Sequence, residues 1–328
     1  MDETSSLLHR SQNESVDLPS PNLRPRHREL IPTPCGPIKP WSELSCLVKL
    51  YYSMTIVSLL AVLALTIVNI YNQSREKYHY EEDFTVSLIQ VVGILFCCYY
   101  ITRGILQENR QELIVFVLSI LIVMIRSVVN FAVLPLDERK SLILARFVCI
   151  LCLGLLHMVC ASLLIRTSSS MAFRVGGALE SLQEQYFLLN LCFSMVTFDL
   201  QAQLCLCILI LTSGISMSYS HSIILGFGVF WACFTAAIGA IAVLKELKPL
   251  VWIFVLQNLP ELAYLIFILY MVIAEWGQGG SYALEGATVT GSWISVMIKG
   301  VLFWALARLY RSFGQGLQER MFASHQQQ

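Results

Sequence analysis

Residues Tyr186 to Ser213 read YFLLNLCFSMVTFDLQAQLCLCILILTS. This stretch is apolar and long enough to cross a bilayer, for which a helix needs about 20 residues. Its middle nevertheless contains Asp199, Gln201 and Gln203. A carboxylate in hydrocarbon costs roughly 2.5–3.5 kcal/mol on insertion scales, so such a residue is rarely left facing lipid. The stretch therefore predicts a membrane-spanning helix whose polar residues face other helices.

The composition of the whole chain is typical of a membrane protein. Of its 328 residues, 56% are hydrophobic and 13% are charged, whereas a soluble domain carries about 25% charged residues. The formal net charge is zero, which does not indicate a nucleic-acid-binding protein. The cysteines lie inside or before apolar runs and lack the paired Cys/His spacing of a zinc site, so we expect no structural disulfide, no metal and no cofactor.

Eight apolar runs are long enough to span a bilayer. They are Leu47–Tyr71, Phe84–Leu106, Leu113–Leu134, Leu144–Ile165, Tyr186–Ser213, Ile223–Leu244, Leu250–Ala274 and Val289–Leu309. The connections between them are short and polar, none is long enough to form an enzyme domain, and no internal repeat stands out. The sequence thus predicts an all-α, polytopic integral membrane protein in contact with the lipid bilayer, with about eight transmembrane helices in residues 46–312.

The two ends of the chain lie outside this transmembrane domain. Residues 1–45 hold seven of the ten prolines, many serines and few large apolar residues. Such a segment cannot bury enough apolar surface to fold, so we predict a disordered cytosolic tail. No apolar region of a signal peptide follows the first residue. Residues 313–328 are predicted to form a short cytosolic C-terminal tail.

The tail contains Glu3-Thr4-Ser5-Ser6-Leu7-Leu8. This motif resembles the acidic dileucine sorting signal, in which an acidic residue lies four positions before a leucine pair. In that family of signals the acid meets a basic patch of a clathrin adaptor, and the leucines fill an apolar pocket. The resemblance covers six residues and implies a clathrin adaptor as partner and the lysosomal or late endosomal membrane as location. The alternative is a chance match in a polar tail.

The distribution of Lys and Arg predicts that both termini are cytosolic. With the N-terminus in the cytosol, most of these residues fall on the cytosolic side, as the positive-inside rule requires. The sequon Asn72-Gln73-Ser74 then lies on the exterior side, where glycosylation is possible in principle. It directly follows the first apolar run, however, and this closeness to the membrane disfavours modification.

Four ionisable residues lie deep inside the predicted spans: Arg126, Asp199, Glu261 and Lys299. Each is roughly ten or more residues from either end of its run, which corresponds to a depth of about 15 Å. All four are therefore expected near one level in the membrane. Intramembrane charges commonly mark ion or substrate pathways. Two acids and two bases can also neutralise each other and hold the helices in place, and both interpretations stay open.

A polar residue lies one helical turn from each of these charges. These residues are Asn130, Gln203, Gln257 and Ser295. Gln201 points to the other side of its helix, so that helix is expected to have polar neighbours on two sides. His157, in the fourth run, is a candidate for a proton relay, with hydrogen-bonded packing as the alternative.

Pro260 directly precedes Glu261. Proline lacks a backbone N–H and frees the carbonyl four residues earlier, here that of Leu256. We therefore predict a helix kink with a free carbonyl beside a carboxylate. Such a combination suits an ion or proton site.

These observations favour a transporter or channel of an endolysosomal membrane, acting on an ion, a proton-coupled solute or a small molecule. One alternative is a seven-helix-type receptor, which the eighth span and the lack of exterior cysteines disfavour. Another is a non-transporting scaffold or adaptor with static intramembrane ion pairs. We expect no enzymatic activity, because neither the His-Glu-x-x-His nor the Gly-x-Ser-x-Gly motif occurs. The sequence leaves the substrate, the oligomeric state and the pairing of the charges open.

Overall fold

The computed structural model describes residues 30–31, 33–75, 81–133, 141–167, 171–177, 179–212, 219–274, 276, 282–317 and 321. The regular structure in these ranges is helical, apart from an isolated bridge between Ile31 and Ile38. The prediction of an all-α protein is therefore confirmed.

Eight of the described helices are long and apolar enough to cross a membrane. They are α2 (Cys46–Arg75), α3 (Glu81–Leu106), α4 (Arg110–Val133), α5 (Ser141–Arg166), α7 (Glu180–Thr212), α8 (Tyr219–Leu244), α9 (Lys248–Ala274) and α10 (Tyr282–Arg311). Each predicted run coincides with one of them, so the multi-pass architecture is confirmed. Two short elements accompany them: η1 (Trp41–Glu43) and α6 (Met171–Gly176).

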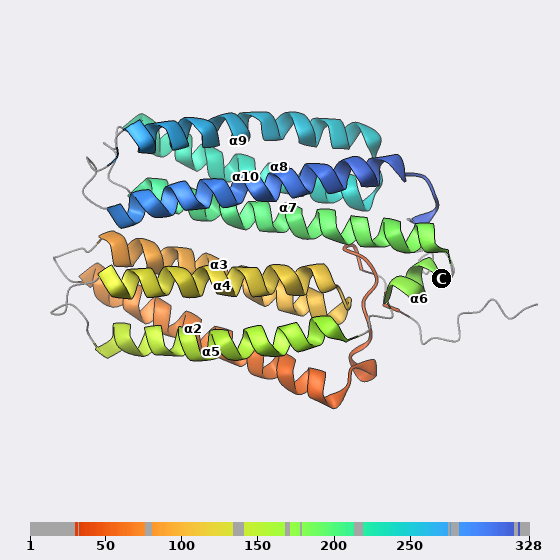
Figure 1. Cartoon of the computed structure of the whole chain (residues 1–328), viewed down its shortest axis with the longest axis horizontal. Helices are drawn as coiled ribbons and strands as arrows, with labels where there is room; N and C mark the ends of the chain where they lie inside the picture. The colour runs from red at the N-terminus through yellow and green to blue at the C-terminus, as the bar shows by residue number, and fades with distance from the viewer. Residues whose placement is uncertain are drawn as a thin grey trace, which may run out of the picture. The chain divides into compact units, whose positions relative to one another are not determined.

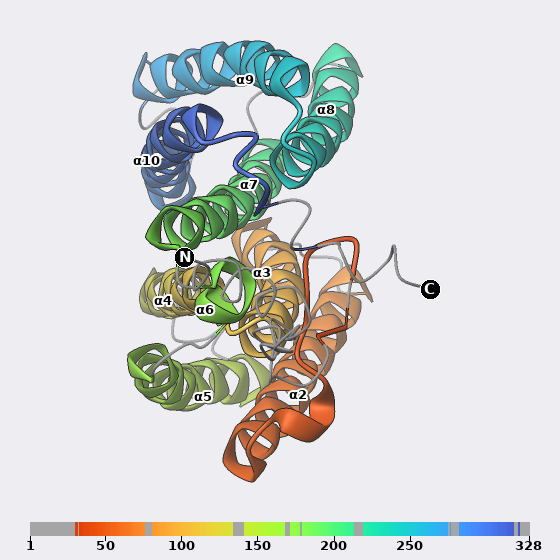
Figure 2. The same cartoon turned by 90° about the vertical axis from the view of Figure 1, so that its right-hand side faces the viewer.

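The long helices pack in two groups of four (Figure 1). In the first group α2 packs against α3 and α5, and α4 packs against the same two helices. In the second group α7 and α9 each pack against both α8 and α10. The groups meet mainly where α7 contacts α3 and α4, and Figure 2, which looks along the helices, shows α7 at this junction.

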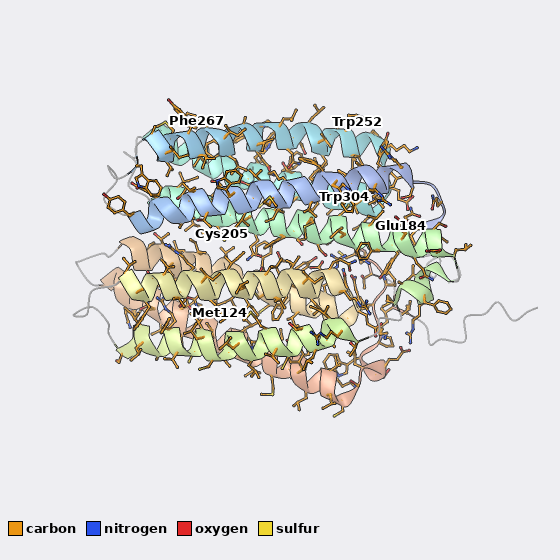
Figure 3. The ribbon with its side chains drawn as sticks, in the orientation of Figure 1. Met124, Glu184, Cys205, Trp252, Phe267 and Trp304 are labelled. Carbon is orange, nitrogen blue, oxygen red and sulfur yellow. The ribbon has the colours of Figure 1, made fainter. Side chains whose placement is uncertain are left out.

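Large apolar side chains cover the outer faces of the helices. Val57, Phe230, Trp252 and Met297 are between 62% and 67% exposed. Figure 3 shows Trp252, Phe267 and Trp304 on the outer sides of α9 and α10. Lipid is the solvent that such surfaces require. The span of α7 differs, because 61% of its most apolar part is buried against 22–50% in the other spans.

The two groups differ in the size of their apolar clusters, and both contain buried polar side chains. The first group has a large apolar cluster drawn mainly from α2, α3, α4 and α5. The second group has only smaller apolar clusters among its described residues. Its buried side chains include Asp199, Asn258, Ser292, Ser295 and Lys299. Because buried polar groups are costly unless they are paired, the partners of these side chains decide what the interior of the second group can do.

Residues 33–45 differ from the sequence prediction, which placed them in the disordered tail. The backbone N–H of Lys39 donates to the carbonyl of Leu106 at the end of α3, at 2.8 Å. Gln107 Nε2 donates to the carbonyl of Cys35 at 3.1 Å. The segment is thus ordered by hydrogen bonds to the α3–α4 turn. Its three prolines lower the entropy that such an extended segment loses on ordering.

Candidate functional site

Three helices of the second group bring charged side chains together in the interior. Lys299 Nζ on α10 donates to Asp199 Oδ2 on α7 at 2.7 Å and to Glu261 Oε2 on α9 at 2.8 Å. It also donates to Asn258 Oδ1 on α9 at 2.7 Å. Lys299 is 2% exposed and Asn258 is 1% exposed. An ammonium group has three N–H donors, so these three contacts use all of them.

The charges of this cluster do not balance. One lysine faces two carboxylates, which leaves one excess negative charge when both are ionised. The remaining oxygens, Asp199 Oδ1 and Glu261 Oε1, are buried and accept no hydrogen bond within the described part of the chain. Excess charge in a low-dielectric interior is strongly disfavoured, and uptake of a proton or a cation relieves it. The cluster therefore has the capacity to bind one further positive charge.

Polar side chains support the cluster on one side. Gln203, one turn after Asp199, donates from Nε2 to Ser295 Oγ at 3.2 Å. Ser295 lies one turn before Lys299 on α10, so the Gln203–Ser295 contact joins the same two helices a second time. A cavity of about 10 Å³ borders Asp199, Gln203 and Glu261. It holds about one water-sized molecule, which suits a proton or a small ion better than an organic solute.

The α9 helix continues through Pro260, and the kink predicted there stays a prediction. Pro260 provides no N–H to the carbonyl of Leu256. The backbone next to it has side-chain partners, because Trp231 Nε1 on α8 donates to the carbonyl of Gln257 at 3.2 Å. Asn258 Nδ2 donates to the carbonyl one turn earlier at 2.8 Å. Asn258 thus connects the helix backbone to the charged cluster.

Gln201 lies on a different side of α7 from Asp199. Its Oε1 accepts hydrogen bonds from Tyr100 Oη on α3 at 2.9 Å and from Ser119 Oγ on α4 at 3.0 Å. The polar neighbours expected on both sides of this helix are therefore present. Gln201 connects the second group of helices to the first and is not part of the charged cluster.

The structure brings together three of the four deep charges that the sequence singled out and places Arg126 elsewhere. Arg126 lies on α4 in the first group and lines a cavity of about 470 Å³ between the two groups. Asn130 is buried one turn further along α4. Gln257 is half-buried, and its side-chain oxygen accepts no hydrogen bond within the described residues.

Asn258 is the contact residue that the sequence analysis missed. It lies three positions before Glu261, and a spacing of three places residues on one helix face just as a spacing of four does. An asparagine in the middle of an apolar run was the available signal.

Two further sets of sequence-predicted residues lie away from the cluster. Asn72 is exposed near the end of α2. Glu3, Leu7 and Leu8 of the sorting motif lie outside the described residues.

Comparison with known families gives a match over most of the chain. A family model described as "Domain of unknown function (DUF7789)" matches residues 35–166 and again residues 176–308. The first stretch contains α2 to α5, and the second contains α7 to α9 and nearly all of α10. The same family model thus covers each group of four helices once. No curated protein and no solved structure matches the chain.

Proposed function

The chain belongs to the family described as DUF7789, whose description assigns no activity, and from the charged cluster we propose that it is a multi-pass transporter or channel for a proton or cation. The proposed solute is the ion itself or a small molecule whose movement is coupled to it. One observation carries the proposal: a single buried lysine contacts two carboxylates at 2.7 and 2.8 Å. The proposed role is not enzymatic.

The excess carboxylate favours transport over static pairing. A pair that only holds helices together needs one acid for each base, because each further buried charge adds a desolvation cost. Here Lys299 would be fully compensated by Asp199 or by Glu261 alone. The second carboxylate adds a group that can take up and release a positive charge while Lys299 stays paired.

The geometry also couples ion binding to the helices. A proton on Glu261 would weaken its contact with Lys299 and leave the lysine paired with Asp199; a proton on Asp199 would do the reverse. Since Asp199 belongs to α7 and Glu261 to α9, the site of protonation changes which helix α10 is held against. A ligand that interacts differently with two helix arrangements shifts the balance between them, and alternating access needs such a shift.

Flux measurements on neutralised variants test the proposal. Asp199→Asn and Glu261→Gln each leave Lys299 with one carboxylate, so both variants should fold. Each should lower proton or cation flux into liposomes containing the purified full-length protein at least about tenfold, which corresponds to about 1.4 kcal/mol. A matched control is Glu184→Gln, an acid that is 54% exposed and lies outside the cluster. Well-folded variants with native flux would contradict the proposal and favour the non-transporting scaffold.

We further propose that the protein resides in the lysosomal or late endosomal membrane with both termini in the cytosol. The support is the Lys and Arg distribution and the motif formed by Glu3, Leu7 and Leu8. Leu7→Ala combined with Leu8→Ala should move the protein to the cell surface, because a clathrin adaptor would lose its apolar contact. Surface biotinylation measures the change, and Ser5→Ala in the same tail should leave the distribution native. Retention of the double variant on lysosomes would count against the motif.

A further inference from the structure

The turn between α3 and α4 and the turn between α8 and α9 have the same unusual backbone. Among the described residues other than glycine, only Glu108 and Glu246 have positive φ, at 49° and 50°. Such values are uncommon for residues with a side chain. In each turn the next residue donates its N–H to the carbonyl five positions earlier, at 3.0 Å in the first turn and 3.2 Å in the second.

The helices on both sides of these turns correspond residue by residue. Helices α3 and α8 each have 26 residues and end two positions before the glutamate. At equal distances after the two glutamates, α4 reads FVLSIL at 116–121 and α9 reads FVLQNL at 254–259. Their first residues, Phe116 and Phe254, are 0% and 2% exposed.

The first helices of the two groups correspond as well. The pair Ser53-Met54 on α2 is followed by LLAVLALTI at 59–67. The pair Ser194-Met195 on α7 is followed, at the same spacing, by LQAQLCLCI at 200–208. Both segments share the pattern Leu-x-Ala-x-Leu-x-Leu-x-Ile. Together with the two stretches that the family model matches, these correspondences indicate an internal repeat that does not stand out in the sequence.

We propose that the chain is a tandem duplication of one four-helix unit, and that each unit holds a binding cavity at the same position. The cavity is charged in the second unit and uncharged in the first. The first cavity binds a small uncharged molecule of a few heavy atoms that carries a hydrogen-bond acceptor.

The central contact of the charged cluster has a counterpart in the first unit. Ser58 and Asp199 each lie four residues after the methionine of their Ser-Met pair. His157 and Lys299 each lie nine residues before the end of their family match. Ser58 Oγ and His157 Nε2 are 2.6 Å apart, and Asp199 Oδ2 and Lys299 Nζ are 2.7 Å apart. Equivalent positions on equivalent helices are therefore hydrogen-bonded in both units.

The cavities beside these contacts share part of their lining. Their volumes are about 50 Å³ in the first unit and about 10 Å³ in the second. Under the correspondence above, six lining positions are shared: Ser58 with Asp199, Leu59 with Leu200, Val62 with Gln203, Ile94 with Ala232, Cys97 with Thr235, and Val123 with Glu261. The first unit thus has serine and valine where the second has its two carboxylates, which removes the attraction for a cation.

One buried donor in the first cavity points to the chemistry of its ligand. Gln90 on α3 lies between this cavity and the cavity of about 470 Å³ that Arg126 lines, and it is 3% exposed. Its Nε2 makes no hydrogen bond within the described residues. Ser58 Oγ donates to the carbonyl of Thr55 at 2.8 Å, so it acts as acceptor toward His157. The amide of Gln90 is therefore the group that an acceptor on a ligand would satisfy. The other walls are mostly apolar, including Met124, which Figure 3 shows between α4 and α5.

Acetamide, an uncharged molecule with a carbonyl acceptor, serves as the probe. Full-length protein in nanodiscs should transfer saturation to the acetamide methyl protons in a concentration-dependent, saturable manner. Gln90→Leu should lower this signal at least tenfold while the melting temperature stays native or rises, because the substitution removes an unpaired buried donor. Gln183→Leu, the same change outside the cavity, should keep the native signal. Three results would overturn the binding proposal. They are a signal that does not saturate, an unchanged signal in Gln90→Leu, and a lower melting temperature of that variant.

A charge transplant tests the equivalence of the units. His157→Lys alone should lower the melting temperature, because it buries a cation without a counter-charge. Adding Ser58→Asp should recover most of the loss by recreating the pair of the second unit. Adding Leu59→Asp instead should not, because the next helix position points about 100° away. A Ser58→Asp/His157→Lys protein no more stable than His157→Lys would refute the equivalence. These readouts are stability and ligand binding, so they are independent of the flux of the second unit.

Discussion

Asp199 and Glu261 share Lys299 as their partner. We therefore expect the stability lost when both acids are neutralised to exceed the sum of the two single losses. The perturbations are Asp199→Asn, Glu261→Gln and the combination of both. Each single variant keeps one carboxylate within 2.8 Å of the lysine, and the combined variant keeps none.

The magnitudes follow from the contacts. A hydrogen bond to a charged group contributes about 1.5–3 kcal/mol. Each single variant replaces one charged acceptor by a neutral amide, which can still accept a hydrogen bond from Lys299, and the excess negative charge disappears. We therefore expect each single variant to lose less than about 1.5 kcal/mol. The combined variant leaves Lys299, which is 2% exposed, without any carboxylate and should lose about 3–5 kcal/mol.

Thermal unfolding of the purified protein, followed by tryptophan fluorescence, measures these differences. At roughly 2–4 °C for each kcal/mol, the combined variant should melt about 6–20 °C below the native protein. The single variants should melt within a few degrees of it. Adding Lys299→Met to the combined variant removes the buried cation and should recover most of the stability.

Two results would refute this reasoning. The first is a combined loss equal to the sum of the single losses, since Lys299 would then interact with each acid independently. The second is a single variant that loses as much as the combined variant, since one carboxylate would then be the only partner of consequence.

Two further predictions concern contacts outside the charged cluster. Arg103→Met should lower the free energy of unfolding by about 3–5 kcal/mol, because the fully buried Glu112 loses the guanidinium that lies 2.6 Å away. Adding Glu112→Leu should recover most of this loss, as measured by thermal melts. A Cβ at Gly239 would lie 2.5 Å from the ring of Phe254, so Gly239→Val should lower stability by about 1–3 kcal/mol. Gly228→Val, where a Cβ meets nothing within 4 Å, should stay within about 0.5 kcal/mol of native, and equal losses in both would contradict the close α8–α9 contact.

The charged cluster was partly predictable. Asp199, Glu261 and Lys299 were recognisable because ionisable residues are rare in apolar runs and stand out at any position. The exclusion of Arg126 was not predictable, because depth along a helix says nothing about which way a side chain faces. Asn258 was overlooked for a related reason: Gln257 and Asn258 are neighbours, and only the rotation of α9 decides which of them meets Lys299.

The correspondences behind the proposed duplication are present in the sequence but hard to see there. Apolar residues recur in every membrane-spanning helix, so matches such as FVLxxL at 116–121 and 254–259 carry little weight alone. The positive φ of Glu108 and Glu246 aligns α3 with α8 and α4 with α9. Neither residue is a glycine, which would mark such a backbone in the sequence. The correspondence of Ser58 with Asp199 follows separately, from the Ser-Met pairs that lie four residues before each of them.

The sequence by itself determined the eight described helices that are long and apolar enough to span a membrane, because the length and apolarity of a span depend on the bilayer and not on the other helices. It also determined that charges lie deep among them. Only the tertiary structure decided that one lysine serves two carboxylates and that Arg126 lies elsewhere, because these contacts depend on how each helix is rotated and which helices are neighbours. Rotation and neighbourhood are set by packing between segments that are far apart in the chain, such as Asp199 and Lys299 at a separation of 100 residues, and no local pattern encodes them.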